Sequence, residues 1–148
     1  MRAVVQRVTA ARVEVAGEVV GRIDRGLVAF LGIGKGDGEG EARYLVDKII
    51  ELRVFEDEQR KMNRAIAEVA GGLLIVSQFT LYGDTSRGRR PGFDRAMAPA
   101  EAERLYDHVV ALARARHSPV ETGRFRADMR VLVDNDGPVT LLLETATS

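Results

Sequence analysis

The stretch VLVDNDGPVTLLLE, residues 131–144, poses the main question about the fold. Two apolar, strand-like runs flank Asp136-Gly137, a pair that typically marks a tight hairpin turn. Pro138 follows at once, and proline donates no backbone N–H, so the first position of the returning strand lacks a ladder hydrogen bond. A hairpin alone does not need this proline. Taken in isolation, the stretch favours a plain turn whose proline discourages pairing at a sheet edge.

Composition limits the architecture and the partners. The chain has 148 residues, 45% of them hydrophobic, which predicts one domain over residues 1–148. Its 22 basic and 22 acidic residues cancel, so a nucleic acid would have to meet a local basic patch. Cysteine is missing, which excludes disulfides, a thiolate nucleophile and sulfur metal ligands. The first 15 residues carry charges throughout and resemble neither a signal peptide nor a membrane span, so we expect a soluble, cytoplasmic protein.

The strands are expected at both ends and in the middle of the chain. Alternation of apolar and polar residues predicts three strands over residues 2–33, with a turn at Ala16-Gly17. The apolar run over residues 71–83 predicts a further buried strand, and the segment 84–93 is a loop by composition. Two strands around the opening stretch complete the β structure.

Two helices are predicted from apolar spacing and end signals. One runs from residue 41 to about residue 55, and the other starts at Pro99, which suits a first helical position. Its apolar stripe is expected at Leu105, Val109 and Leu112. The fold class is therefore α+β, a compact, mainly β domain with two principal helices.

Several familiar chemistries fit this sequence poorly. The glycine-rich segment 32–41 has neither the P-loop nor the dinucleotide spacing, so it is interpreted as a strand-to-helix turn. His108 and His117 are too few for a common zinc site, and no metal or cofactor is expected. Sequence alone does not test a Ser-His-Asp triad, because its members meet only in the fold. A serine-type esterase therefore stays open as a minor alternative.

Two polar segments call for a further explanation. In SQFT, strand alternation places Gln78 and Thr80 on one face and Ser77 and Phe79 on the other, so polarity gathers at the strand's end. Such groups either build a site or are satisfied structurally. The loop that follows is basic, and its cluster is interpreted either as a nucleic-acid contact or as a solvated surface. The cluster consists of Arg87, Arg89, Arg90 and Arg95.

Together these segments carry a resemblance to a known family. The motifs MRAVVQRV, SQFTLYGD, GRRPGF, ETGRF and NDGPVT occur in the order seen in D-aminoacyl-tRNA deacylases of the bacterial and eukaryotic type. The resemblance covers essentially the whole chain. It implies a compact, largely β, barrel-like fold, a homodimer, and hydrolysis of the ester that joins a D-amino acid to the terminal adenosine of tRNA.

The resemblance also implies roles for individual residues. The run Ser77, Gln78, Phe79 and Thr80 matches the lining of the aminoacyl pocket, with Thr80 proposed for catalysis. Gly137 and Pro138 match a Gly-cis-Pro element that reaches into the partner subunit's pocket. Further matches are an arginine that holds this element and two pocket-lining positions; these residues are Arg7, Phe125 and Met129. The charge of the basic loop makes Arg87, Arg89 and Arg90 the candidate tRNA contacts. The chain departs from the family at Arg126, where a small residue is expected, and at Gly92, where serine is frequent.

A mechanism follows from the resemblance and from stereochemistry. Rigid backbone at Gly137-Pro138 would exclude an L side chain, so glycyl-tRNA is expected to be accepted together with D-aminoacyl-tRNA. Hydrolysis is assigned first to positioning, backbone N–H groups and the tRNA 2′-hydroxyl, and second to Thr80 as nucleophile, which would need an adjacent base. The main alternative is a non-catalytic RNA-binding module built on the basic loop, Arg87 to Arg95.

Overall fold

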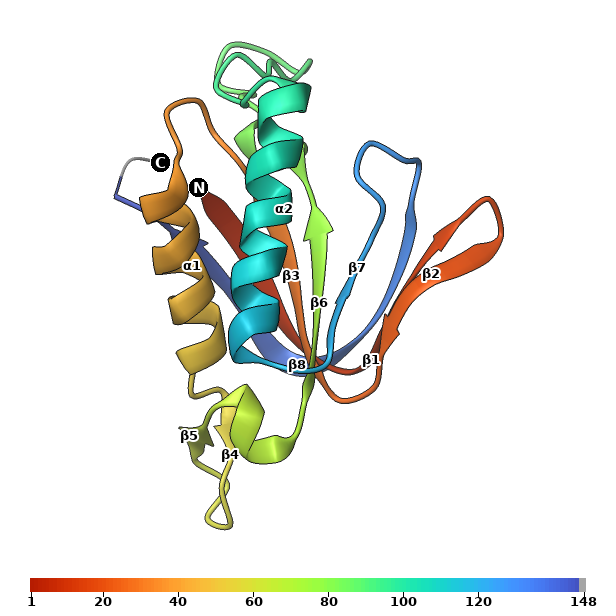
Figure 1. Cartoon of the computed structure of the whole chain (residues 1–148), viewed down its shortest axis with the longest axis vertical. Coiled ribbons are helices and arrows are strands. Elements are labelled where there is room, and N and C mark those ends of the chain that lie inside the picture. The colour runs from red at the N-terminus through yellow and green to blue at the C-terminus, as the bar shows by residue number, and fades with distance from the viewer. Residues whose placement is uncertain (147–148) are drawn as a thin grey trace.

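The computed structural model describes residues 1–146, so the last two residues of the expected domain lie outside the described part. Its centre is a six-stranded mixed sheet in the order β2-β1-β3-β6-β7, with β8 paired to the other edge of β1 (Figure 1). The β3–β6 and β6–β7 pairs are parallel, and the others are antiparallel. The strands are β1 (Arg2–Val15), β2 (Glu18–Ile23), β3 (Gly26–Gly32), β6 (Gly72–Ser77), β7 (Val120–Thr122) and β8 (Arg130–Glu144).

The sheet curls until its two ends nearly meet. A Cβ atom on Gly21 of β2 would lie 2.2 Å from the carbonyl oxygen of Thr122 in β7, so only glycine permits this approach. The predicted barrel-like α+β architecture with two principal helices is therefore confirmed. The three strands expected over residues 2–33 are also confirmed, and Ala16 and Gly17 turn between the first two with φ of 51° and 81°.

Two helices, α1 (Glu39–Glu51) and α2 (Pro99–Arg116), lie side by side across one face of the sheet (Figure 1). The small strands β4 (Phe55–Glu56) and β5 (Met62–Arg64) extend beyond one end of this layer. The short 3-10 helices η1 (Ile66–Val69) and η2 (Phe79–Tyr82) precede and follow β6.

The sheet is buried on both faces, which explains the unbroken apolar runs of its central strands. Leu27 and Leu73 point into the larger core, under the helices, whereas the neighbouring residues Val28 and Leu74 point into a second core inside the curled sheet. Alternating side chains thus fill two cores, so a slip by one residue would exchange them.

The expected hairpin at Asp136-Gly137 is wrong. Both halves of the stretch pair with the same strand: Arg130 to Asn135 lie beside Glu14 to Val8, and Thr140 to Glu144 beside Gln6 to Arg2. The four residues 136–139 form a wide bulge opposite Arg7. The local turn signal fails because each apolar run finds its partner in β1, far away in sequence, and not in the other run.

The strand expected over residues 71–83 is too long. β6 ends at Ser77, and residues 79–82 form η2, so the face assignment based on strand alternation does not apply beyond Ser77. Both helices begin within two residues of the expected position, but α1 ends at Glu51 and not near residue 55, because Leu52 already leaves the helical conformation with ψ 128°.

The apolar stripe of α2 is rotated from the expected one. Val109 is buried as predicted, but Leu105 and Leu112 are only half-buried. The helix packs closely on α1 and over the sheet, so its small and aromatic residues face the core. The buried set is Ala102, Tyr106, Val109, Val110 and Ala113.

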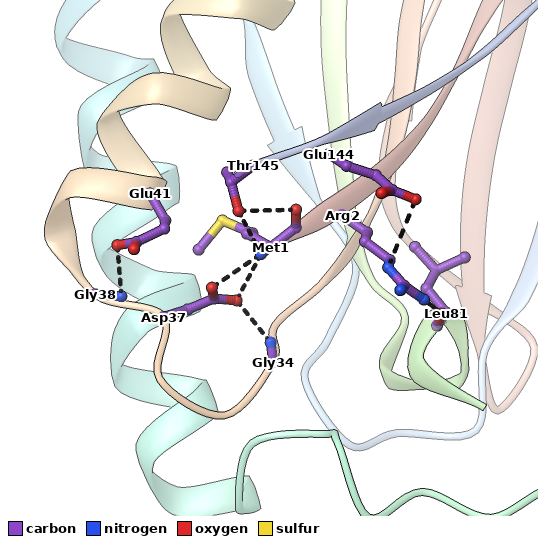
Figure 2. Close-up of polar contacts among 9 residues, drawn as sticks. All are labelled: Met1, Arg2, Gly34, Asp37, Gly38, Glu41, Leu81, Glu144 and Thr145. Atoms are coloured by element: carbon purple, nitrogen blue, oxygen red, sulfur yellow. Dashed lines mark hydrogen bonds and ion pairs between the residues drawn. The ribbon is translucent and has the colours of Figure 1, made fainter. Parts of the chain in front are cut away.

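The glycine-rich segment is a strand-to-helix turn, as expected, and it contains an unexpected buried ion pair (Figure 2). The Met1 ammonium lies 2.9 and 2.8 Å from the two carboxylate oxygens of Asp37 and donates to the Thr145 hydroxyl at 2.8 Å. Asp37 also accepts the Gly34 N–H at 2.7 Å. We refer to Met1, Asp37 and Thr145 as the N-terminal anchor. It ties both ends of the described chain to the turn before α1.

The two histidines have structural surroundings. His117 is buried, with Nε2 2.7 Å from the Gly71 carbonyl oxygen, and His108 is half-buried on α2. Within residues 1–146, no group of three or more His, Asp or Glu side chains is arranged to hold a metal ion, and no helix is long and apolar enough to cross a membrane.

Candidate active site

The site begins where β6 ends. The Gln78 N–H donates to the Leu31 carbonyl at 2.7 Å and continues the strand pairing, after which the chain turns into η2. The side-chain amide of Gln78 donates to the Thr80 hydroxyl in a short hydrogen bond. Both Phe79 and Thr80 are exposed. The predicted alternation of Ser77 to Thr80 between two strand faces is therefore wrong, and these four residues form a compact corner.

Arg2 fixes this corner from β1 (Figure 2). Its guanidinium donates to the Leu81 carbonyl at 2.9 Å and lies 4.6 Å from the centre of the Tyr82 ring. Glu144 of β8 stands 3.7 Å away on its other side. Arg2 directly follows Met1, so the residue that holds η2 adjoins the N-terminal anchor in the chain.

A cavity of about 290 Å³ opens beside the corner. Ser77 and Phe79 line it from one side, and Phe125 contributes a third residue predicted for the pocket. The lining is mostly apolar, as expected for a small-ligand site with few polar groups. The full set is Ile33, Ser77, Phe79, Met97, Pro99, Ala102, Phe125 and Arg126.

Aromatic contacts hold the cavity walls. The Phe79 ring meets Phe93 edge-on at 5.1 Å, and the Phe125 ring lies 5.7 Å from Tyr106. The Tyr106 hydroxyl donates to the Ile75 carbonyl at 2.8 Å. Burial raises the pKa of this hydroxyl above its ordinary value. Tyr106 is thus a neutral structural donor behind the cavity and does not provide a base.

The other predicted pocket residues lie elsewhere in this chain. Gln78 and Thr80 stand next to the cavity without lining it. Met129 packs against the second core, and its sulfur atom lies 2.7 Å from where a Cβ on Gly123 would be. Gly137 and Pro138 are exposed on the bulge of β8 and do not line the cavity of their own chain.

The bulge is held firmly from inside the same chain. Arg7 is buried, donates to the Val54 carbonyl at 2.6 Å, and pairs with Asp136 at 3.0 Å. Asn135 donates to the carbonyls of Arg7 and Val139 at 3.0 and 3.2 Å. The Gly137-Pro138 peptide bond is cis, as the resemblance implied. The prediction that Arg7 adjoins this element is consistent with these contacts.

The basic loop surrounds a second hollow of about 530 Å³. Arg87, Arg90 and Arg95 line it, whereas Arg89 is exposed outside it. Hydrogen bonds from the side chain and backbone of Ser86 lower the pKa of Asp84, which keeps this loop carboxylate ionised. Gly92 has open space around its Cβ direction, so the serine frequent at this position would fit.

Arg126 stands at the mouth of the first cavity. It is exposed, and its φ of 64° is in the left-handed region, which is uncommon for a residue other than glycine. The expectation of a small residue at this position is consistent with that backbone conformation.

Comparison with known proteins identifies the family. The family described as D-Tyr-tRNA(Tyr) deacylase matches residues 4–144. The chain belongs to this family. A D-aminoacyl-tRNA deacylase from Sorangium cellulosum (strain So ce56) is 60% identical, over 98% of this chain and 97% of that protein. One from Symbiobacterium thermophilum (strain DSM 24528 / JCM 14929 / IAM 14863 / T) is 58% identical, over 98% and 96%.

Solved structures share the fold of this chain. A protein named c-Myc DNA Unwinding Element Binding Protein is 42% identical and matches with a TM-score of 0.93, over 98% of this chain and 99% of that one. A structure described as a probable eukaryotic D-amino acid tRNA deacylase matches with a TM-score of 0.79 at 18% identity, over 96% and 97% of the two chains. The second match supports the fold alone.

Sequence reasoning missed one wall of the first cavity. Met97, Pro99 and Ala102 line it from the segment before α2 and from its first turn. Pro99 was recognised only as a helix start. The available signal was topological: a helix that begins beside the carboxyl end of a parallel strand commonly borders a site.

Proposed function

We propose that this protein hydrolyses the ester between a D-amino acid and the terminal adenosine of tRNA. The observation that carries the proposal is the apolar cavity bordered by Ser77, Phe79 and Phe125 in a chain of the deacylase family. Its volume of about 290 Å³ suits an aminoacyl group and not a folded RNA segment. The site is expected in the cytoplasm, where aminoacylated tRNA is used.

Side-chain chemistry contributes little in this proposal. No histidine or carboxylate lines the cavity among the described residues, and the Thr80 hydroxyl has the Gln78 amide as its hydrogen-bond donor. A threonine nucleophile requires a base within hydrogen-bond reach. Aminoacyl esters are activated already, so positioning, backbone N–H groups at the turn after β6 and the neighbouring 2′-hydroxyl of the tRNA are sufficient. The 2′-hydroxyl orients the attacking water.

Stereoselection is assigned to a second copy of the chain. Gly137 and Pro138 are exposed on a bulge held by Arg7 and Asn135, apart from the cavity of their own chain. In a homodimer, this element enters the partner subunit's cavity and obstructs the direction of an L side chain.

The outer surface of β8 supports such a dimer. Within the described residues, β8 pairs only with β1, so its other edge is unpaired over a strand of 15 residues. Leu141 and Leu142 are 37% and 61% exposed on it. Long, apolar edge strands invite pairing with another chain. A partner on β8 would cover both features and would bring the Gly137-Pro138 bulges close to the interface.

The test offers one tRNA charged with a D-amino acid, its L enantiomer, or glycine, and follows ester loss. We expect the D ester and glycyl-tRNA to be cleaved at comparable rates and the L ester to be spared, because exclusion acts on an L side chain only. If the D ester is cleaved and glycyl-tRNA is not, the exclusion model is wrong and the cavity must recognise the D side chain directly. Retention of all three esters would refute the deacylase proposal.

A second candidate function is nucleic-acid binding without hydrolysis. Its support is the arginine-lined hollow of Arg87, Arg90 and Arg95, together with the name of the 42% identical relative, which describes that protein as binding a DNA element. A pure phosphate binder loses affinity steeply as salt rises and binds charged and uncharged tRNA alike. Binding measurements on both tRNA forms, over a range of salt concentrations, distinguish this function from the deacylase.

A further inference from the structure

Arg126 is the only charged residue among those that line the cavity. Ser77 is the one other polar side chain there, and the remaining walls are apolar. The cation therefore stands at the entrance of a site that otherwise recognises shape. Its left-handed backbone, with φ 64°, is stabilised locally by the Ala127 N–H, which donates to the Arg124 carbonyl at 3.2 Å and closes the turn around it.

The guanidinium of Arg126 is available to a ligand. It makes no ion pair or hydrogen bond with another residue of the described chain, whereas Arg2, Arg7 and Arg116 each pair with a carboxylate. A guanidinium presents a planar set of donors that matches phosphate and carboxylate oxygens in pairs. An exposed, unpaired arginine at a cavity mouth thus fits an anionic part of the ligand.

The proposed substrate offers one suitable anion on the nucleotide that carries the ester. Its α-amino group is cationic and would be repelled by Arg126, so contact with the amino acid backbone is disfavoured. The ribose that carries the ester also carries a phosphate at its 5′ position. With the aminoacyl group in the cavity, this ribose lies at the mouth, and its phosphate is the nearest negative charge.

We propose that Arg126 binds the 5′-phosphate of the terminal adenosine and thereby positions the ester in the cavity. This inference rests on the proposed deacylase function. The contact is separate from the basic loop, because the hollow of Arg87, Arg90 and Arg95 shares no lining residue with the cavity. Arg126 holds the terminal nucleotide, while the loop is left for phosphates further along the RNA.

The experiment measures binding of two unreactive analogues, in which an amide replaces the ester of a D-aminoacyl adenosine. One analogue carries a 5′-phosphate and the other does not. We expect Arg126→Ala to weaken binding of the phosphorylated analogue about tenfold, the loss typical of one charge-assisted hydrogen-bonded pair. Binding of the unphosphorylated analogue should stay unchanged. Arg126→Lys should be intermediate, because it retains the charge without the paired donors.

Arg60 provides a matched control. It is also exposed, has a left-handed φ of 62°, makes no ion pair within the described residues, and lies in the β4–β5 turn at the far end of the molecule (Figure 1). Arg60→Ala should leave both affinities unchanged. Thermal unfolding of each variant checks that the fold is intact.

Equal weakening of both analogues by Arg126→Ala would overturn the phosphate contact in favour of an effect on cavity shape, and no weakening of either would overturn it outright. With D-aminoacyl-tRNA, the contact predicts a raised KM, an unchanged kcat and a salt slope reduced by about 1. Because the analogues report binding alone, their result stands even if wild-type protein leaves D-aminoacyl-tRNA intact, an outcome that would refute the proposed function instead.

Discussion

Polar groups are buried and paired in the N-terminal anchor, whereas those of the candidate active site are exposed. In the anchor, the side chains of Met1 and Asp37 are 0% and 2% exposed, and the ammonium has both Asp37 and Thr145 as partners. At the site, Thr80 and Arg126 are exposed, and Arg87, Arg90 and Arg95 of the basic loop line a hollow of about 530 Å³. A buried charge must be paired to be tolerated, whereas a charge that awaits a ligand must stay open. Exposure therefore separates the groups that hold the fold from the groups proposed to meet the substrate.

The largest effect is expected from breaking the proposed homodimer, because in that proposal the site is incomplete in one chain. Leu142→Asp places a charge on the exposed apolar edge of β8. We predict a folded monomer that has lost stereoselective deacylation altogether, measured by light scattering after gel filtration and by ester loss. Val19→Asp, at an equally apolar but distant position on β2 with 50% exposure, should remain dimeric and active. A fully active, stereoselective Leu142→Asp monomer would contradict the proposed arrangement.

The next effect concerns stability alone. Asp37→Asn removes the Asp37 charge from its buried pair with the Met1 ammonium, and removal of one partner from a buried pair typically costs about 3 to 5 kcal/mol. We predict a loss of that size in the free energy of unfolding, measured with denaturant, with kcat retained under conditions where the protein stays folded. Glu39→Gln changes an exposed side chain at the start of α1, the helix that follows Asp37, and should cost about 0.5 kcal/mol. A loss below about 1 kcal/mol for Asp37→Asn would show that the pair contributes little.

The anchor also marks where sequence reasoning reaches its limit. Met1 contacts Asp37, 36 residues away in sequence, and Thr145, 144 residues away, and no local sequence pattern predicts either contact. Asp37 belongs to the glycine-rich segment 32–41, which the sequence predicts only as a strand-to-helix turn. The bulge at Gly137-Pro138 fails for the same reason, since its hairpin signal is local and its partner β1 is distant. Periodicity predicted the strands and helices well because burial of a face repeats along each element.

The site was predictable to the extent that motifs carry it. Ser77, Phe79 and Phe125 were expected at the pocket from a family resemblance, and they do line one cavity. Met129 was expected there too and packs in the second core of this chain. Residue types alone did not distinguish the two positions, because phenylalanine and methionine suit a core and a pocket equally well. The course of the turn after β6, the start of α2 and the segment between β7 and β8 decides which side chains border the cavity.

A smaller effect is predicted for Tyr106, which lies behind the cavity and belongs to the fold. Tyr106→Phe removes the hydrogen bond that the tyrosine hydroxyl donates to the Ile75 carbonyl. This carbonyl still accepts the Gly123 N–H at 3.2 Å. We expect a cost of about 1 kcal/mol at pH 7, measured by urea unfolding. Tyr44→Phe, at a half-exposed position, should cost nothing measurable.

The same substitution has a signature in pH. Burial raises the pKa of the Tyr106 hydroxyl in the folded protein above the unfolded value of 10.0, so the folded state holds this proton more tightly. Its contribution to stability is complete below pH 10 and is lost progressively above it, as the unfolded chain ionises first. In Tyr106→Phe, the free energy of unfolding should therefore fall less steeply above pH 10, because position 106 no longer ionises. An identical alkaline slope in both proteins would mean that Tyr106 is not held neutral by the fold.

The smallest effect is expected at Thr80, the residue to which a catalytic role is most easily assigned. Thr80 follows the strand end and has a hydroxyl, but it is exposed, its hydrogen-bond donor is Gln78, and no histidine or carboxylate lines the adjacent cavity among the described residues. If backbone groups and the 2′-hydroxyl carry the reaction, Thr80→Ala should lower kcat by less than about tenfold. A general acid or base typically contributes roughly 10² to 10⁴-fold, and loss of a nucleophile on the order of 10⁶-fold. Single-turnover ester loss on D-aminoacyl-tRNA separates these ranges, and a tRNA whose terminal ribose lacks the 2′-hydroxyl supplies the reciprocal test. Removal of the 2′-hydroxyl should slow deacylation far more than Thr80→Ala does, because in this proposal the groups that perform the chemistry belong to the protein's backbone and to the RNA.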